Sequence, residues 1–106
     1  MENQHRKIAG YRELSQTEID LMNRIKAKGA ELLELQAELV DLLKLQELGK
    51  INAIDSAQTG DAEAEAKAEF NRFNAAEPFR WSAIGKTDIQ TGIMALVRAV
   101  AQPAGV

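Results

Sequence analysis

Apolar residues recur three or four positions apart between residues 16 and 48, which is the spacing of a helix face. They form two stripes: Leu32, Leu35, Leu39 and Leu42 in one, and Leu33, Val40 and Leu43, with Gln36 between them, in the other. Burying a leucine is worth roughly 1.5–3 kcal/mol, so a stripe left in water would forgo several such contributions. We therefore expect the helix to pack against another helix of its own chain and against other copies of the protein. The plainer alternative is a helical hairpin of one chain.

Capping residues mark both ends of this helix. Ser15 and Glu18 have the spacing of a reciprocal capping box, and Gly49 stands where a left-handed cap would end the helix. The pattern therefore predicts a long helix over residues 15–49. Gly29 lies in its interior and predicts a kink or a close approach of another backbone. Because the apolar set drifts around the helix, the strict heptad of an extended coiled coil is absent.

The rest of the chain predicts a second helical arm. Residues 50–60 are expected to form a turn and residues 61–101 the arm, which is interrupted at Pro78 because proline breaks a helix or begins a new one. Gly85 and Gly92 lie on the edge of its apolar face, where we expect helices to approach closely. That face consists of Trp81, Ile84, Ile89, Ile93, Leu96, Val97 and Val100.

Residues 1–14 form a polar cap segment ahead of the long helix. Within it Ile8, Tyr11 and Leu14 recur at three-residue spacing and predict a short N-terminal helical turn. No segment shows the sustained alternation of a strand. We therefore expect an all-α fold in a single domain: an antiparallel helical hairpin with a short N-terminal helix, assembled as an oligomer.

Composition narrows the possible chemistry. The 106 residues include no cysteine, which excludes disulfides, thiolate metal sites and cysteine nucleophiles and fits a cytoplasmic protein. No apolar run approaches the roughly 20 residues of a membrane-spanning helix. His5 is the single histidine and is best explained as a solvated residue. Since nucleotide-binding and zinc-protease motifs are also missing, we expect a binding protein that is not an enzyme and that needs no cofactor or metal.

Charge and aromatic residues indicate what could be bound. The net charge is +2 over residues 1–28, −7 over 29–77 and +2 over 78–106, so a hairpin would bring its two basic ends together. Tyr11 offers an aromatic ring and Lys26 an ammonium group, a combination that suits a nucleobase and its phosphate. The plainer alternative is that Tyr11 packs the cap segment down and Lys26 is solvated.

Two runs of sequence resemble a known family. KIAGYRELS at residues 7–15 is followed by EIDLMN at 18–23, and TDIQTG at 87–92 is followed by MALVRA at 94–99. These runs resemble the phage anti-CBASS cyclic-nucleotide sponge family. Residues 50–77 carry no such motif. The C-terminal run alone also resembles hairpin proteins that sequester Thoeris signals.

The resemblance implies a homohexamer, a trimer of dimers, in the host bacterial cytoplasm. Members of the family bind cyclic dinucleotides such as 3′,3′-cGAMP without degrading them, so neither a membrane nor polymeric nucleic acid is expected as a partner. The cyclic dinucleotide site carried over to this chain consists of Tyr11 and Lys26, with Gly10, Arg12 and Lys7 beside them. A second site, for cyclic trinucleotides on the three-fold axis, is assigned to Arg80 and Lys28.

Symmetry agrees with this resemblance. An isologous dimer presents each side chain twice, so two Tyr11 rings and two Lys26 ammonium groups would match a cyclic dinucleotide group for group. Two other functions stay open: a structural helical oligomer or protein-binding adaptor, and a sponge for a cyclic ADP-ribose-type Thoeris signal.

Overall fold

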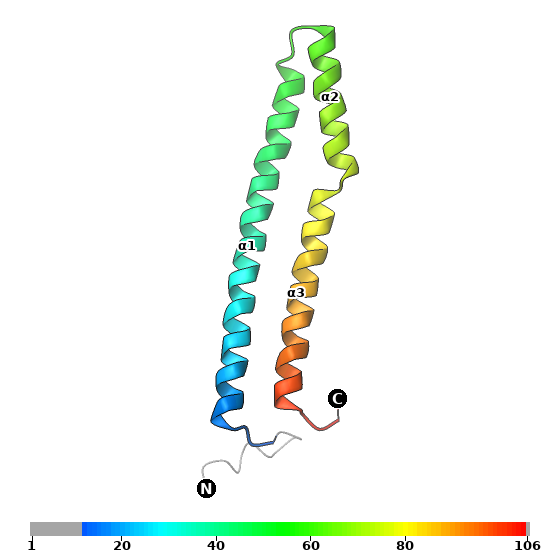
Figure 1. Cartoon of the computed structure of the whole chain (residues 1–106). Coiled ribbons are helices and arrows are strands. Elements are labelled where there is room, and N and C mark those ends of the chain that lie inside the picture. Colours follow the sequence, from blue (N-terminus) through cyan, green and yellow to red (C-terminus); the bar gives the residue numbers. More distant parts are fainter. Residues whose placement is uncertain (1–11, 106) are drawn as a thin grey trace. The chain divides into compact units, whose positions relative to one another are not determined.

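The computed structural model describes residues 12–105, which form three helices. In order along the chain these are α1 (Gln16–Asp55), α2 (Gly60–Ala75) and α3 (Pro78–Ala101), as labelled in Figure 1. The described residues contain no strand, which confirms the predicted all-α hairpin. The predicted N-terminal helical turn falls mainly on residues 1–11, outside the described residues, and residues 12–15 are not helical.

The described residues form two compact units. Unit 1 contains the described residues up to Leu33 and from Thr87 onward, and unit 2 contains Glu34–Lys86. None of the helices between residues 12 and 105 is long and apolar enough to span a bilayer.

The predicted end of the long helix at Gly49 is wrong, because α1 continues to Asp55. The helix continues because Lys50 and Ile54 keep packing along the same face, and a glycine inside a helix is tolerated at a modest cost. The turn is correspondingly short and spans residues 56–59 instead of 50–60. It ends at Thr59, whose Oγ1 accepts a 3.0 Å hydrogen bond from the amide of Ala62 and caps α2.

In unit 2 the inner face of α1 follows a heptad spacing that the apolar pattern did not indicate. Its buried and half-buried positions are spaced alternately four and three residues apart: Gln36, Val40, Leu43, Glu47, Lys50 and Ile54. Three of these six residues are polar or charged, so the repeat is invisible to a search for apolar residues. The expectation that the apolar residues lack a strict heptad holds, and the repeat is visible only when the polar residues that pack are counted with them.

The other leucine stripe of α1 is exposed. In unit 2 the side chains of Leu35, Leu39 and Leu42 are 59%, 44% and 50% exposed, whereas Leu43 is 7% exposed. The stripe that contains Leu33, Val40 and Leu43 thus packs within the chain. The stripe that contains Leu35, Leu39 and Leu42, called the outer stripe below, does not.

A charged cluster joins α1 to α2 in unit 2. The Nζ atom of Lys50 lies 3.1 Å from Oε2 of Glu69 and 5.3 Å from the centre of the Phe73 ring. Arg72 donates two further hydrogen bonds, of 2.7 and 2.6 Å, to the same carboxylate. Arg72 and Lys50 together lower the pKa of Glu69 from 4.5 to about 2. Phe73, 4% exposed, also packs edge-on against Phe79 across the break between α2 and α3.

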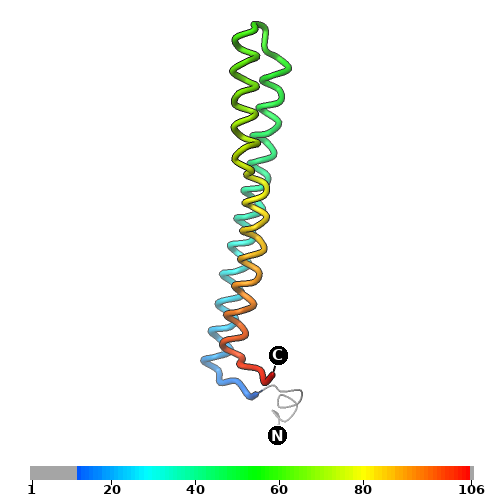
Figure 2. The backbone as a smooth tube through the Cα atoms, turned by 90° about the vertical axis from the view of Figure 1, so that its right-hand side faces the viewer, coloured from blue at the N-terminus to red at the C-terminus, as the bar shows by residue number. Residues whose placement is uncertain are grey.

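In unit 1 the first part of α1 and the last part of α3 run side by side in opposite directions (Figures 1 and 2). Gly29 is buried where they meet, and a Cβ atom added to it would overlap the side chain of Ile93, within 2.7 Å of Cγ1. The predicted close approach at Gly29 therefore exists, but the neighbour is a side chain and not a backbone. At Gly85 and Gly92 an added Cβ would have no neighbour within 4 Å in the described part of the chain, so the close approach predicted there is not found.

Candidate functional site

The predicted dinucleotide site depends mainly on Lys26 and Tyr11, and the structure describes only Lys26 of the two. Lys26 lies in α1 within unit 1. Tyr11, Gly10 and Lys7 lie outside the described residues. The geometry of the site therefore has to be built from Lys26 and Arg12.

Lys26 has an exposed side chain on α1. Within residues 12–105 it has neither an ion pair nor a hydrogen bond from its side chain. Lys28 differs, because its Nζ atom lies 3.3 Å from Oε2 of Glu31 one turn away. Two residues along a helix correspond to about 200° of rotation, so Lys26 and Lys28 point in nearly opposite directions. This agrees with their assignment to different sites.

Arg12 is engaged at every guanidinium nitrogen. Its Nη2 atom donates a 2.9 Å hydrogen bond to the carbonyl of Val100 and forms an ion pair with the carboxylate of Glu18. Its Nε atom donates a 3.2 Å hydrogen bond to the carbonyl of Ala101. Nη1 lies 3.4 Å from the carbonyl of Glu13. The side chain is 37% exposed. The Arg12 guanidinium is thus bound at the end of α3 and the start of α1.

Glu18 is the acidic partner of Arg12 and also completes the predicted capping box. The amide of Ser15 donates a 2.9 Å hydrogen bond to Oε1 of Glu18, and the amide of Glu18 donates a 3.2 Å hydrogen bond to Oγ of Ser15. The hydrogen bond from Arg12 and that from Ser15 lower the pKa of Glu18 from 4.5 to about 2. Glu18 is therefore ionised at neutral pH, which keeps its attraction for Arg12.

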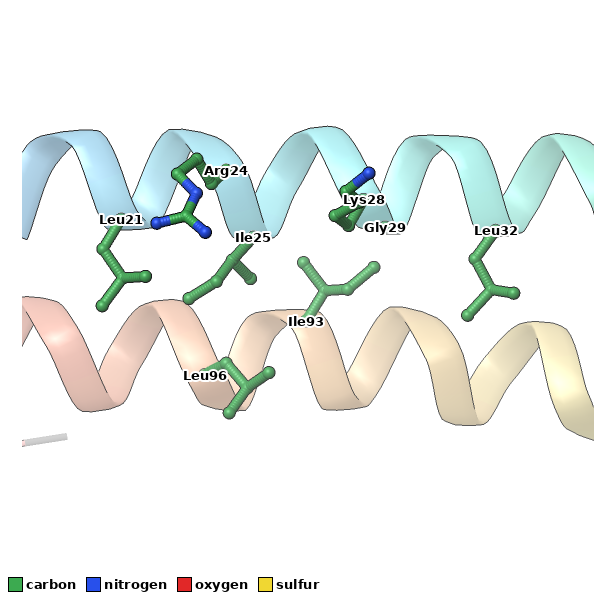
Figure 3. Close-up of a pocket in the computed structure, with 8 residues that line it drawn as sticks. All are labelled: Leu21, Arg24, Ile25, Lys28, Gly29, Leu32, Ile93 and Leu96. Atoms are coloured by element: carbon green, nitrogen blue, oxygen red, sulfur yellow. The ribbon is translucent and has the colours of Figure 1, made fainter.

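Unit 1 also contains a shallow apolar groove that sequence reasoning missed. It has a volume of about 330 Å³ and lies between α1 and α3, beside the contact of Gly29 with Ile93 (Figure 3). Its walls are Leu21, Arg24, Ile25, Lys28, Gly29, Leu32, Ile93 and Leu96. The spacing of Leu21, Ile25, Lys28 and Leu32 along one face of α1 was the available signal. Lys26 does not line this groove.

The two residues assigned to a cyclic trinucleotide site belong to different units, Lys28 to unit 1 and Arg80 to unit 2. The guanidinium of Arg80 lies 5.0 Å from the centre of the Trp81 ring, and its Nε atom is 3.6 Å from Oε2 of Glu77. Trp81 is 59% exposed. Arg80 and Trp81 thus form an exposed cationic and aromatic pair on α3.

Comparison with known proteins covers nearly the whole chain. Residues 4–101 match the family model described as the Acb2/Tad1 hairpin domain. The chain is also 60% identical over 107 residues to "Anti-CBASS protein 2" of Pseudomonas phage JBD67, with 99% of each chain covered. Both matches include the two ends on which the resemblance to the anti-CBASS family rested, and also residues 50–77, which carried no motif.

Proposed function

Because the chain belongs to the Acb2/Tad1 hairpin family, we propose that it is a phage anti-CBASS protein that binds cyclic dinucleotides and withholds them from the bacterial defence. The similarity to "Anti-CBASS protein 2" over the full chain is the observation that carries this proposal. In this proposal the protein acts in the host cytoplasm, binds ligands such as 3′,3′-cGAMP and performs no reaction on them.

Tyr11 and Lys26 are the proposed ligand contacts. Lys26 has no ion pair among residues 12–105, which supports this role, since a lysine without a competing carboxylate can approach a phosphate. Tyr11 would stack on a base, which contributes about 1–3 kcal/mol per base. Binding at nanomolar affinity requires about −12 kcal/mol, so two such stacks leave most of the affinity to paired charges in a preorganised pocket.

Self-association supplies that preorganised pocket in the proposal. The outer stripe on α1 is an apolar surface that residues 12–105 leave exposed, and such surfaces are typical of protein interfaces. An isologous dimer would present Tyr11 and Lys26 twice to a ligand with two bases and two phosphates. We propose the homohexamer, a trimer of dimers, as the assembled form. Lys28 and Arg80 are the proposed contacts for a cyclic trinucleotide on its three-fold axis.

Calorimetric titration with 3′,3′-cGAMP tests the proposal. We expect the wild-type protein to bind it, and Tyr11→Ala and Lys26→Ala each to weaken binding at least tenfold while the oligomer mass stays unchanged. Lys44→Ala is the matched control, because Lys44 is another exposed lysine of α1 that the proposal does not use. Unchanged binding by either site variant would show that the site is assigned to the wrong residues.

The ligand panel and the recovered ligand separate the alternatives. A heat of binding with a cyclic ADP-ribose isomer, and none with any cyclic dinucleotide, would identify the protein as a sponge for the Thoeris type of signal. No heat with any nucleotide would leave a structural oligomer or adaptor. We expect 3′,3′-cGAMP to be recovered intact after the complex is denatured, whereas a linear product would show that the protein is an enzyme.

A further inference from the structure

In unit 1 the side chain of Arg12 bonds both to the start of α1 and to the end of α3. Arg12 donates to the carbonyls of Val100 and Ala101, which lie in the last turn of α3. Carbonyls in this turn lack the amide donors that a continuing helix would provide, and they form the negative end of the helix dipole. A guanidinium is well suited to this position because its planar fork reaches two acceptors at once.

The carboxylate of Glu18 holds the guanidinium from the other side. Glu18 is itself fixed by the amide of Ser15, so Arg12 is bound between the capped start of α1 and the last carbonyls of α3. The group formed by Arg12, Glu18 and the carbonyls of Val100 and Ala101 is called the Arg12 bridge below. It contains one positive and one negative side chain, which leaves little net charge with which to attract an anion.

We propose that Arg12 is a positioning residue for the nucleotide site and not a ligand contact. The inference rests on the proposed function, because the residue that it would position is Tyr11, the next residue along the chain. The Arg12 bridge holds residue 12 against the start of α1, the helix on which Lys26 lies. Since each guanidinium nitrogen already has a protein acceptor, a phosphate would have to displace these partners to bind Arg12.

Neutralising Glu18 distinguishes positioning from contact by the sign of its effect. If Arg12 bound the phosphate, Glu18→Gln would free the guanidinium and tighten the binding of 3′,3′-cGAMP. If Arg12 positions Tyr11, the same change loosens the bridge and weakens binding. We expect Glu18→Gln and Arg12→Lys each to weaken binding about tenfold, as when only about a tenth of the protein is in the binding-competent arrangement. Arg98→Ala is the matched control, because Arg98 is an exposed arginine of α3 that lies outside the Arg12 bridge.

A spectroscopic measurement tests the bridge without any ligand. The chain has a single tyrosine, so incorporated 3-fluorotyrosine gives one ¹⁹F resonance that reports on Tyr11 alone. We expect Arg12→Lys and Glu18→Gln to move this resonance and Arg98→Ala to leave it in place. If the wild-type protein bound no cyclic dinucleotide, the proposed function would fail, and the ¹⁹F spectra would still decide whether the bridge positions Tyr11. Tighter binding by Glu18→Gln, or a resonance identical in all variants, would overturn the inference.

Discussion

Two glycines of α1 have opposite surroundings although both lie inside the same helix. Gly29 is buried against Ile93, whereas Gly49 is exposed, and within residues 12–105 no atom beyond its own helical turn lies within 4 Å of the place where a Cβ would stand. Both positions stood out in the sequence, Gly29 as a glycine in the helix interior and Gly49 as the expected cap at the helix end. The sequence could not say which glycine is required, because the neighbour at Gly29 comes from α3, far away along the chain.

The two glycines therefore predict alanine substitutions with opposite effects. We expect Gly29→Ala to lower the free energy of unfolding, because overpacking costs about 1–3 kcal/mol and outweighs the helix propensity gained. We expect Gly49→Ala to raise it by about 0.5–1 kcal/mol, since only the propensity changes. Urea denaturation followed by circular dichroism measures both. If Ile93→Ala did not reduce the cost of Gly29→Ala, the overlap with Ile93 would not be its cause.

The capping box shows how far local residues can be predicted. Ser15 and Glu18 were paired correctly from a spacing of three residues, and the structure confirms the hydrogen bonds. Arg12 was placed in the dinucleotide site beside Tyr11 as part of what the family resemblance implied. Its partners Val100 and Ala101 belong to the opposite end of the chain, so no local pattern pointed to the Arg12 bridge.

Among the helices, the contact between α1 and α2 depends on charged residues at positions that a coiled coil would fill with apolar ones. Lys50 occupies such a position and is held by Glu69 and the Phe73 ring. The helix was predicted to end at Gly49 because that glycine resembles a C-terminal cap. The polar Lys50 that follows it gave no sign that the packed face continues.

This contact predicts a dependence on acid. The pKa of Glu69 falls from 4.5 to about 2 in the folded protein, so its contribution to stability is complete above pH 4.5 and is lost as the pH falls toward 2. We expect Glu69→Gln to make the loss of helicity between pH 4.5 and 2 less steep and to lower stability at neutral pH. Glu65→Gln is the control, because Glu65 is an exposed α2 carboxylate without an ion pair in the described part of the chain. An unchanged acid profile for Glu69→Gln would contradict this role for Glu69.

For the molecule as a whole, the described residues bury little within one chain. Leu43 and Phe73 are the apolar side chains that are buried among residues 12–105, while large apolar residues of both units are exposed. This imbalance was predictable from the sequence, since two apolar stripes on one helix exceed what one partner helix can cover. The sequence did not decide which stripe would face inward, because both have the same spacing and similar composition.

The outer stripe predicts an association that one charge can disrupt. We expect Leu39→Glu to reduce the mass of the particle in size-exclusion chromatography with light scattering, because a carboxylate would be buried in the interface without a partner. Lys44→Glu is the control, because it changes the charge of the same helix by more than Leu39→Glu does. We expect the Lys44→Glu protein to keep the wild-type particle mass. An undiminished particle for Leu39→Glu would mean that the outer stripe is not the contact surface.

The thin interior of the hairpin has a consequence for infection. If the proposed oligomer forms, partner chains complete the folding, so stability would depend on how many copies are present and dilution would lower the melting temperature. The binding capacity of the protein would then rise more steeply than its copy number, and early synthesis would produce little protection until a threshold dose is reached. A phage that depends on such a protein gains by expressing it early and abundantly.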